Sequence, residues 1–210
     1  MLGSAILAEV VASKNTYTRK EFVDKYGAFI FAQTKGTGIF PETLISQAIL
    51  ESSGDYNGEW LVGGSKLARE SNNFFGIKAD SRWNGKTYNI DTGEVFNGKK
   101  VTVNANFRAY NSVKDSIKDY VKFLQENKRY TNALDSANYY NQAKELQKAG
   151  YATAPNYADT LKGVVVPLLP IIEDERKKFK RNRNLKLVGS GVLFIGTLLL
   201  VVYLTTDKKK

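Results

Sequence analysis

The 210-residue sequence contains no cysteine and no histidine. Without cysteine the chain forms no disulfide and offers no thiolate to a metal ion. Without histidine it cannot build the common zinc sites or a Ser-His-Asp triad. The groups that remain for acid–base chemistry are carboxylates, tyrosines and lysines. Hydrophobic residues make up 42% of the chain, which is enough for one well-packed domain with appended segments.

Acidic residues are scarce at the C-terminal end, and this scarcity explains most of the net charge of +10. From Arg176 onward ten residues are Lys or Arg and only Asp207 is acidic, so this tail carries +9 and the preceding 175 residues carry about +1. The main part of the chain therefore lacks the broad basic face that drives phosphate binding. We expect no nucleic-acid partner, and the basic tail is typical of a membrane flank.

The stretch from Leu187 to Leu204 has no charged residue over 18 positions. At about 1.5 Å per residue, a helix of this length just crosses a hydrocarbon core about 30 Å thick. The sequence predicts a transmembrane helix at 187–206, a basic juxtamembrane linker at 170–186 and a basic tail at 207–210. The partner of this single-pass anchor would be the lipid bilayer of a host inner membrane or a virion membrane. Residues 1–17 lack the charged start of a secretory signal and are predicted to be a short segment with an amphipathic helix.

One carboxylate falls on the apolar face of a predicted helix. Pro41 suits the first helical position and Gly54 suits the exit, so the segment between them is expected to be helical. Within it Leu44, Ala48 and Glu51 share one face. Desolvation there would keep Glu51 protonated near neutral pH, as a general acid requires. The alternative is that a frayed last turn lets Glu51 swing into solvent.

A second carboxylate falls on the apolar face of a predicted β-hairpin. The stretch from Lys86 to Tyr110 alternates polar and apolar residues, and Asn97-Gly98 is a favoured two-residue turn. This turn places Glu94 opposite Val101, on the buried side of the sheet. The alternative is an edge-strand charge that discourages aggregation.

Capping signals and apolar periodicity predict the remaining helices. These cover roughly Thr18–Gln33, Lys66–Ser71, Ser112–Glu126 and Asn138–Ala149, and a last helix near Tyr157 is expected to extend through Pro167 and Pro170 with a kink. The residues between Gly54 and Lys66 are expected to form a loop.

Five blocks of the chain occur in the order and at the spacing of a known family. They are AILESSG, SNNFFGIK, the hairpin glutamate followed by Asn97-Gly98, FRAYNSVKDSIKDYVKFL and GYATAPNYADTL. Together they resemble the endo-β-N-acetylglucosaminidase family, the glucosaminidase domain of bacterial autolysins, flagellar peptidoglycan hydrolases and phage lysins. The resemblance covers residues 18–169. It implies a mainly α (α+β), lysozyme-like helical domain with a small β-hairpin, which cleaves the β-1,4 bond on the reducing side of N-acetylglucosamine in peptidoglycan glycan strands.

The resemblance also implies roles for three residues. Glu51 matches the family's catalytic acid in its A-x-x-E-S block, Glu94 matches the hairpin glutamate proposed as the second carboxylate, and Tyr157, in NYAD, matches a tyrosine associated with activity. Glycoside hydrolysis needs a protonated carboxyl and usually a second group, so Glu94 would act as base or stabiliser or leave that role to the substrate's acetamido group. Inverting and retaining routes both stay open, and no metal or cofactor is expected.

Polar and aromatic side chains near these blocks suit a sugar cleft by their chemistry. They are Asn72, Asn73, Phe75, Trp83, Tyr110 and Tyr151. For each aromatic residue the alternative is packing in the core.

Two other functions stay open. The Glu51-Ser52 block also resembles the single-glutamate block of lytic transglycosylases and muramidases, and a non-catalytic, membrane-anchored cell-wall-binding or virion structural protein could keep the same fold. Seven positive residues precede the predicted span and three follow it, which favours a cytoplasmic domain, whereas peptidoglycan lies outside the membrane. A phage protein for entry or lysis, or an exported bacterial protein, would reconcile the two.

Overall fold

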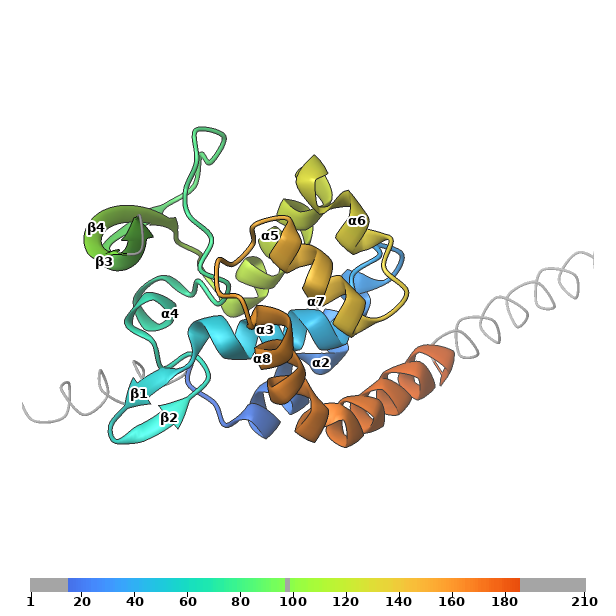
Figure 1. Cartoon of the computed structure of the whole chain (residues 1–210). Helices are drawn as coiled ribbons and strands as arrows, with labels where there is room; N and C mark the ends of the chain where they lie inside the picture. The colour runs from blue at the N-terminus through green and yellow to red at the C-terminus, as the bar shows by residue number, and fades with distance from the viewer. Residues whose placement is uncertain (1–14, 97–98, 186–210) are drawn as a thin grey trace, which may run out of the picture.

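The computed structural model describes residues 15–96 and 99–185, and between 92 and 101 it describes the backbone only. The described chain is mainly helical with two small antiparallel hairpins (Figure 1). The helices are α2 (Arg19–Thr34), α3 (Pro41–Ser52), α4 (Lys66–Ser71), α5 (Val113–Glu126), α6 (Thr131–Leu134), α7 (Tyr139–Lys148) and α8 (Tyr157–Val165), with short 3₁₀ turns η1 (Lys128–Tyr130) and η2 (Val166–Leu168). The hairpins pair β1 (Gly54–Tyr56) with β2 (Glu59–Leu61) and β3 (Thr87–Phe96) with β4 (Lys99–Arg108). The predicted mainly α fold class with a small hairpin is confirmed.

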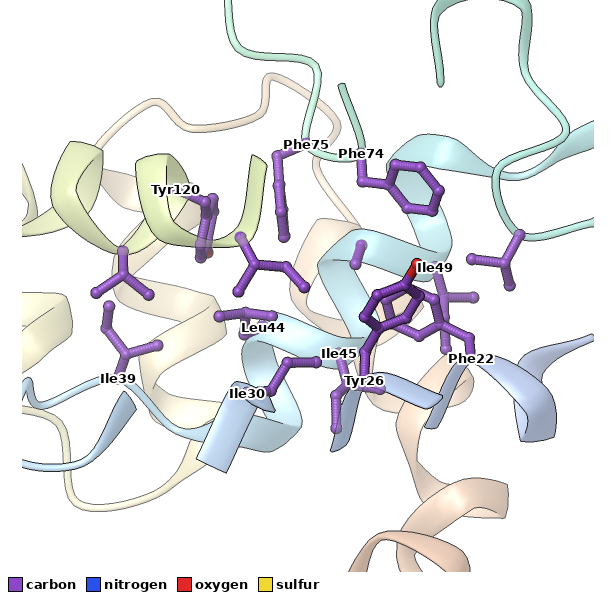
Figure 2. Packing of buried hydrophobic residues seen from close by; sticks show 14 of the residues in the cluster. Phe22, Tyr26, Ile30, Ile39, Leu44, Ile45, Ile49, Phe74, Phe75 and Tyr120 are labelled. Carbon is purple, nitrogen blue, oxygen red and sulfur yellow. The ribbon is translucent and has the colours of Figure 1, made fainter. Parts of the chain in front are cut away.

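Helix α3 is the centre of the fold. It packs against α2, α7 and α8 (Figure 1), and eight of its twelve residues are buried, so more than one of its faces is covered. Leu44, Ile45 and Ile49 supply the apolar part of this surface. Figure 2 shows Leu44 on the side of Phe75 and Tyr120, whose rings stack with centroids 4.1 Å apart, and Ile49 on the side of Phe74 and Phe22. The core is therefore built around the helix that carries Glu51.

The last turn of α3 is held from two sides. Ser52 Oγ donates to the carbonyl oxygen of Ala48 (2.6 Å) and accepts from the backbone N–H of Gly63 (3.0 Å). Ser52 is fully buried, so these bonds are shielded from water. The helix end next to Glu51 is therefore pinned, and the frayed last turn considered from the sequence is not the arrangement found.

Residues 54–61 form a hairpin where the sequence analysis expects a loop. The turn is Asn57-Gly58, with φ of 55° and 84°. Positive φ at both central residues is the type I′ geometry, whose twist matches that of the flanking strands. The same Asn-Gly signal that predicted the longer hairpin was thus present here. Gly54 does not end the helix through a positive φ; a Cβ on it would lie 2.7 Å from the backbone nitrogen of Ser65, so close backbone approach requires glycine.

The β3–β4 hairpin has the predicted register. Glu94 pairs with Val101 and Phe96 pairs with Lys99, as a two-residue turn requires. The turn residues at 97–98 lie outside the described residues. The alternation is visible at the inner end of β4, where Phe107 is buried and Asn106 is exposed.

The predicted helix starts are confirmed. Thr18 and Glu21 form a capping box at α2, and the side chains of Ser112 and Asn138 accept backbone hydrogen bonds at the starts of α5 and α7. The turn η1 and the short helix α6 were not predicted, because they have neither the length nor the periodicity that such signals need.

Residues 169–185 are helical and pack on the domain, although the sequence analysis assigns 170–186 to a linker. Ile172 is 1% exposed, and the Phe179 ring lies 5.9 Å from that of Phe31 on α2. The Arg176 guanidinium pairs with Glu42 on α3. The kink expected at the prolines takes the form of η2, which separates α8 from this last helix.

Across the ranges that the structure describes, no helix combines the length and the apolar character needed to span a bilayer. The span predicted at 187–206 lies outside those ranges. So do residues 1–14 of the N-terminal segment at 1–17, for which an amphipathic helix is expected.

Candidate active site

Glu51 lies in the last turn of α3, half-buried, with its side chain against α8. The Tyr157 hydroxyl donates a hydrogen bond to Glu51 Oε1 over 3.1 Å. Burial raises the pKa of Glu51, and the hydrogen bond from Tyr157 opposes this rise by stabilising the ionised form. The result is a carboxyl group that keeps its proton to a higher pH than a free glutamate does.

The hydrogen bond to Glu51 is the end of a chain of buried polar groups. Tyr157 Oη accepts a hydrogen bond from Gln47 Nε2 (2.8 Å), and Gln47 Oε1 accepts one from the Tyr120 hydroxyl. Gln47 and Tyr120 are both 0% exposed, so water cannot replace these partners. Sequence reasoning assigned neither residue to the site. The i, i+4 spacing of Gln47 and Glu51 on α3 was an available signal, whereas Tyr120 comes from the distant helix α5.

The second carboxyl oxygen of Glu51 faces Gly76. A Cβ placed on Gly76 would lie 3.9 Å from Oε2, and Gly76 has a φ of 63°, which favours glycine. The loop that presents Gly76 is held by Asn73, whose Nδ2 donates to the carbonyl oxygens of Ile77 (3.0 Å) and Arg108 (2.8 Å). Glycine at 76 therefore leaves Oε2 free of a side chain on that side.

The inner end of the β3–β4 hairpin is fixed to α5 through Arg108. Its guanidinium donates to Asp119 Oδ2 (2.9 Å) and lies 4.8 Å from the Trp83 ring and 5.6 Å from the Phe123 ring. Glu94 is placed in the outer half of the hairpin by its pairing with Val101, and its side chain lies outside the described residues. The described side chains therefore include one candidate acid, Glu51, together with the residues that hold it.

The family model described as mannosyl-glycoprotein endo-beta-N-acetylglucosaminidase, called Glucosaminidase, matches residues 28–167, about two thirds of the chain. The chain belongs to the glucosaminidase family. The match includes all the candidate catalytic residues and ends just before the helix at 169–185.

Relatives and solved structures agree with this membership. The glucosaminidase domain is similar to peptidoglycan hydrolase FlgJ of Vibrio cholerae, with 40% identity over 72% of this chain and 44% of the relative, and to exo-glucosaminidase LytG of Bacillus subtilis, with 32% identity over 79% of this chain and 58% of the relative. The chain thus spans about half the length of these curated relatives. The crystal structure of the catalytic domain of the autolysin Auto from Listeria monocytogenes aligns with a TM-score of 0.60 at 27% identity, covering 82% of this chain and 97% of that one.

Three of the predicted sugar-binding residues are interior in this glucosaminidase domain. Asn73 is 1% exposed and Phe75 is 2% exposed, and Tyr110, at 9%, donates its hydroxyl hydrogen bond to Asp119 Oδ2 (2.7 Å). The Phe75 ring is stacked on Tyr120, so for Phe75 the core-packing alternative describes what is found. Buried side chains cannot touch a glycan in this conformation, so this arrangement does not support the direct sugar contact predicted for Asn73, Phe75 and Tyr110.

The other three predicted residues are only partly covered. Tyr151 lies between the rings of Tyr120 and Tyr157, at centroid distances of 6.2 and 6.1 Å, and its hydroxyl donates to the carbonyl oxygen of Phe75 (3.0 Å). Trp83 donates its indole N–H to the backbone carbonyl of Lys86 (2.9 Å).

Asn72 has left-handed backbone, with φ of 53°, and its amide donates to the carbonyl oxygen of Tyr110 (3.0 Å). Like Trp83 and Tyr151, it retains exposed surface that a sugar could contact.

Two clefts elsewhere on the described part of the domain contain none of the predicted site residues. One, of about 470 Å³, is lined by polar residues of α6, α7 and the segment between them. The other, of about 260 Å³, lies between the C-terminal end of α2 and the helix at 169–185. Glu51 and its hydrogen-bond partners are therefore separate from both clefts.

The raised pKa of Glu51 predicts a signed effect of pH on stability. Between the unfolded-state pKa of about 4.5 and the higher folded-state pKa, the folded protein holds more protons, so the free energy of unfolding contributed by Glu51 falls as pH rises. We expect Glu51→Gln to be more stable than the wild type at about pH 7 and to lose this advantage at about pH 3.5. Urea unfolding at both pH values measures it, with exposed Glu59→Gln as the control. An advantage that is equal at the two pH values would contradict the prediction.

Proposed function

We propose that this glucosaminidase domain hydrolyses peptidoglycan, at the β-1,4 bond on the reducing side of N-acetylglucosamine. The single observation that carries the proposal is the half-buried Glu51, held by Tyr157 and with its pKa raised by burial. The substrate is supported by the relatives named peptidoglycan hydrolase FlgJ and exo-glucosaminidase LytG. The proposal thus joins a site suited to general acid catalysis with a family of glycosidases.

In this mechanism Glu51 donates its proton to the glycosidic oxygen as the bond from that oxygen to the anomeric carbon breaks. Glu51 is then ionised, and the Tyr157 hydroxyl already donates to the carboxylate oxygen that must carry part of the charge. Water completes the hydrolysis at the anomeric carbon. Glu94 activates that water or stabilises the developing positive charge, unless the substrate's acetamido group takes this role.

Analysis of the products from purified sacculi tests the bond specificity. Digestion followed by borohydride reduction and mass spectrometry should show reduced N-acetylglucosamine ends. Reduced muramic ends would instead identify a muramidase, and 1,6-anhydro products would identify a lytic transglycosylase. A wild-type domain that binds sacculi without releasing fragments would be a non-catalytic cell-wall or virion component.

Replacing Glu94 separates the two roles considered for the second group. If Glu94 activates water, Glu94→Gln should lower kcat by about 10²-fold or more, the scale of general base catalysis. If the acetamido group acts, Glu94→Gln should keep most of the activity, while a substrate analogue without that group should not be cleaved. Steady-state kinetics on soluble glycan fragments would measure both.

We further propose that residues 187–206 anchor the domain in a membrane. The 18 uncharged positions and the basic residues on both sides support this proposal. The full chain should sediment with membranes and resist high-salt extraction, whereas a chain ending at 186 should be released. Protease accessibility of the domain in intact cells, spheroplasts and virions would then show which side it faces, and whether the setting is phage entry or lysis or a bacterial envelope.

A further inference from the structure

The hydrogen bonds that reach Glu51 have a defined direction. A tyrosine hydroxyl has one proton to donate, and an amide side chain accepts only on its oxygen. Tyr120 donates to Gln47 Oε1, so the amide nitrogen of Gln47 is turned toward α8 and donates to Tyr157 Oη. Having accepted that bond, Tyr157 directs its own proton to Glu51 Oε1.

This direction decides which oxygen of a neutral Glu51 carries the proton. Oε1 accepts from Tyr157, so the acidic hydrogen belongs on Oε2, the oxygen that faces Gly76. If the Gln47 amide were turned over, its oxygen would face Tyr157 and would accept that hydroxyl proton. Oε1 would then have to carry the acidic hydrogen and point it at Tyr157, away from any substrate.

We propose that Gln47 and Tyr120 are positioning residues that hold the proton of Glu51 on Oε2, ready for transfer to the glycosidic oxygen. This inference rests on the proposed function of Glu51 as the general acid. Neither residue touches the substrate: both are 0% exposed, and they act only through Tyr157.

The surroundings hold the amide of Gln47 in this orientation. The Tyr120 ring stacks on Phe75, which fixes the position of its hydroxyl, and α3 fixes the backbone of Gln47 in the centre of the core. With no exposed surface, Gln47 has no water to satisfy its oxygen if Tyr120 is lost. Losing the Tyr120 hydroxyl should therefore allow Gln47 to turn its oxygen toward Tyr157.

The tyrosines around Glu51 do not compete with it as titrating groups near neutral pH. In the described part of the chain these are Tyr157 on α8, Tyr120 on α5 and Tyr151 in the segment before α8. Burial raises the pKa of each above its ordinary value of 10.0. A chemical-shift change of the Glu51 carboxyl carbon near neutral pH therefore reports the ionisation of Glu51 and not that of a neighbouring tyrosine.

The test uses Gln47→Met and Tyr120→Phe in the full chain, with Tyr157→Phe for comparison. Each should lower kcat about tenfold with little change in KM, a part of the ~10²- to 10⁴-fold that general acid–base catalysis contributes. Each should also raise the pKa of Glu51, measured by ¹³C NMR of its carboxyl carbon. In Tyr120→Phe the turned amide of Gln47 takes the proton of Tyr157, and in Gln47→Met Tyr157 loses the N–H donor that polarises its hydroxyl, so in both variants Tyr157 stabilises the ionised form less. The matched control is Tyr130→Phe. It also removes the hydroxyl of a buried tyrosine, but this hydroxyl accepts a hydrogen bond from Arg129 and takes no part in the series of hydrogen bonds that ends at Glu51.

A double variant shows whether the effect passes through Tyr157. In a Tyr157→Phe background, Gln47→Met and Tyr120→Phe should have no further effect on the pKa of Glu51. The proposal is overturned if the single variants leave the pKa and kcat as in the wild type, or if they act equally strongly in that background. The NMR titration needs no substrate, so the hydrogen-bond inference can be judged even if the domain proves not to cleave peptidoglycan.

Discussion

Glu51→Gln should reduce the turnover of purified peptidoglycan by at least about 10³-fold, within the range that general acid catalysis supplies. Glutamine has nearly the same shape and keeps an oxygen that can accept from Tyr157, but it has no proton to give to a leaving oxygen. The folded structure should be retained, because the neutral amide is easier to bury than an ionised carboxylate. Release of reducing ends from sacculi, followed over time, measures the loss.

The control for this variant is Glu59→Gln, on the neighbouring β2 strand. Glu59 is exposed, so its replacement makes the same Glu-to-Gln change on the surface without touching the site. It should leave turnover within about twofold of the wild type, since exposed charges away from a site have small effects. Full lytic activity in Glu51→Gln would show that the catalytic acid is another residue, and the mechanism given above would have to be abandoned.

Asn73→Ala should lower the free energy of unfolding by about 4 kcal/mol, because it strips partners from several buried backbone groups at about 1–3 kcal/mol each. Asn73 Nδ2 serves two carbonyl oxygens, and its Oδ1 accepts from the backbone N–H groups of Phe75 (3.3 Å) and Ile77 (3.2 Å). All four hydrogen bonds are buried, so water cannot replace the Asn73 side chain as the partner of these backbone groups. Urea unfolding followed by circular dichroism measures the loss.

Asn72→Gly is the matched comparison. Asn72 has positive φ, which glycine adopts without strain. Its amide nitrogen donates to the carbonyl oxygen of Tyr110 (3.0 Å) and its amide oxygen accepts from Asn15 Nδ2 (2.6 Å), and both hydrogen bonds are only partly buried. Its replacement should cost only about 2 kcal/mol, the scale of two hydrogen bonds whose groups water can still reach. Equal losses for the two variants would mean that the four bonds of Asn73 do not hold the loop as described.

The pair of asparagines shows what sequence reasoning could not separate. Both occur beside aromatic residues, in a block whose chemistry suits a sugar. An amide that binds a sugar and an amide that binds its own backbone look the same in the sequence, because the choice depends on what lies opposite. Here the carbonyl of Arg108, from the inner end of the hairpin, lies opposite Asn73.

Much of the secondary structure followed from local signals. Capping residues marked the starts of α2, α5 and α7, and the turn Asn97-Gly98 gave the pairing of Glu94 with Val101. The β1–β2 hairpin was missed although Asn57-Gly58 carried the same signal. The sequence analysis assigned residues 170–186 to a linker because this stretch has many charged residues and few apolar ones. The few apolar residues are recognised as part of the core only when the surface of α2 that they pack against is known.

By itself the sequence determined that a glutamate ends an apolar helix face, because the helical period fixes which residues share a side whatever the surroundings. It also carried the blocks that mark the glucosaminidase family. Tertiary structure alone decided that Tyr157 reaches Glu51, that Gln47 and Tyr120 direct that hydroxyl, and that glycine stands beside Oε2. These contacts join helices far apart in the chain, and such contacts are set by how the whole core packs.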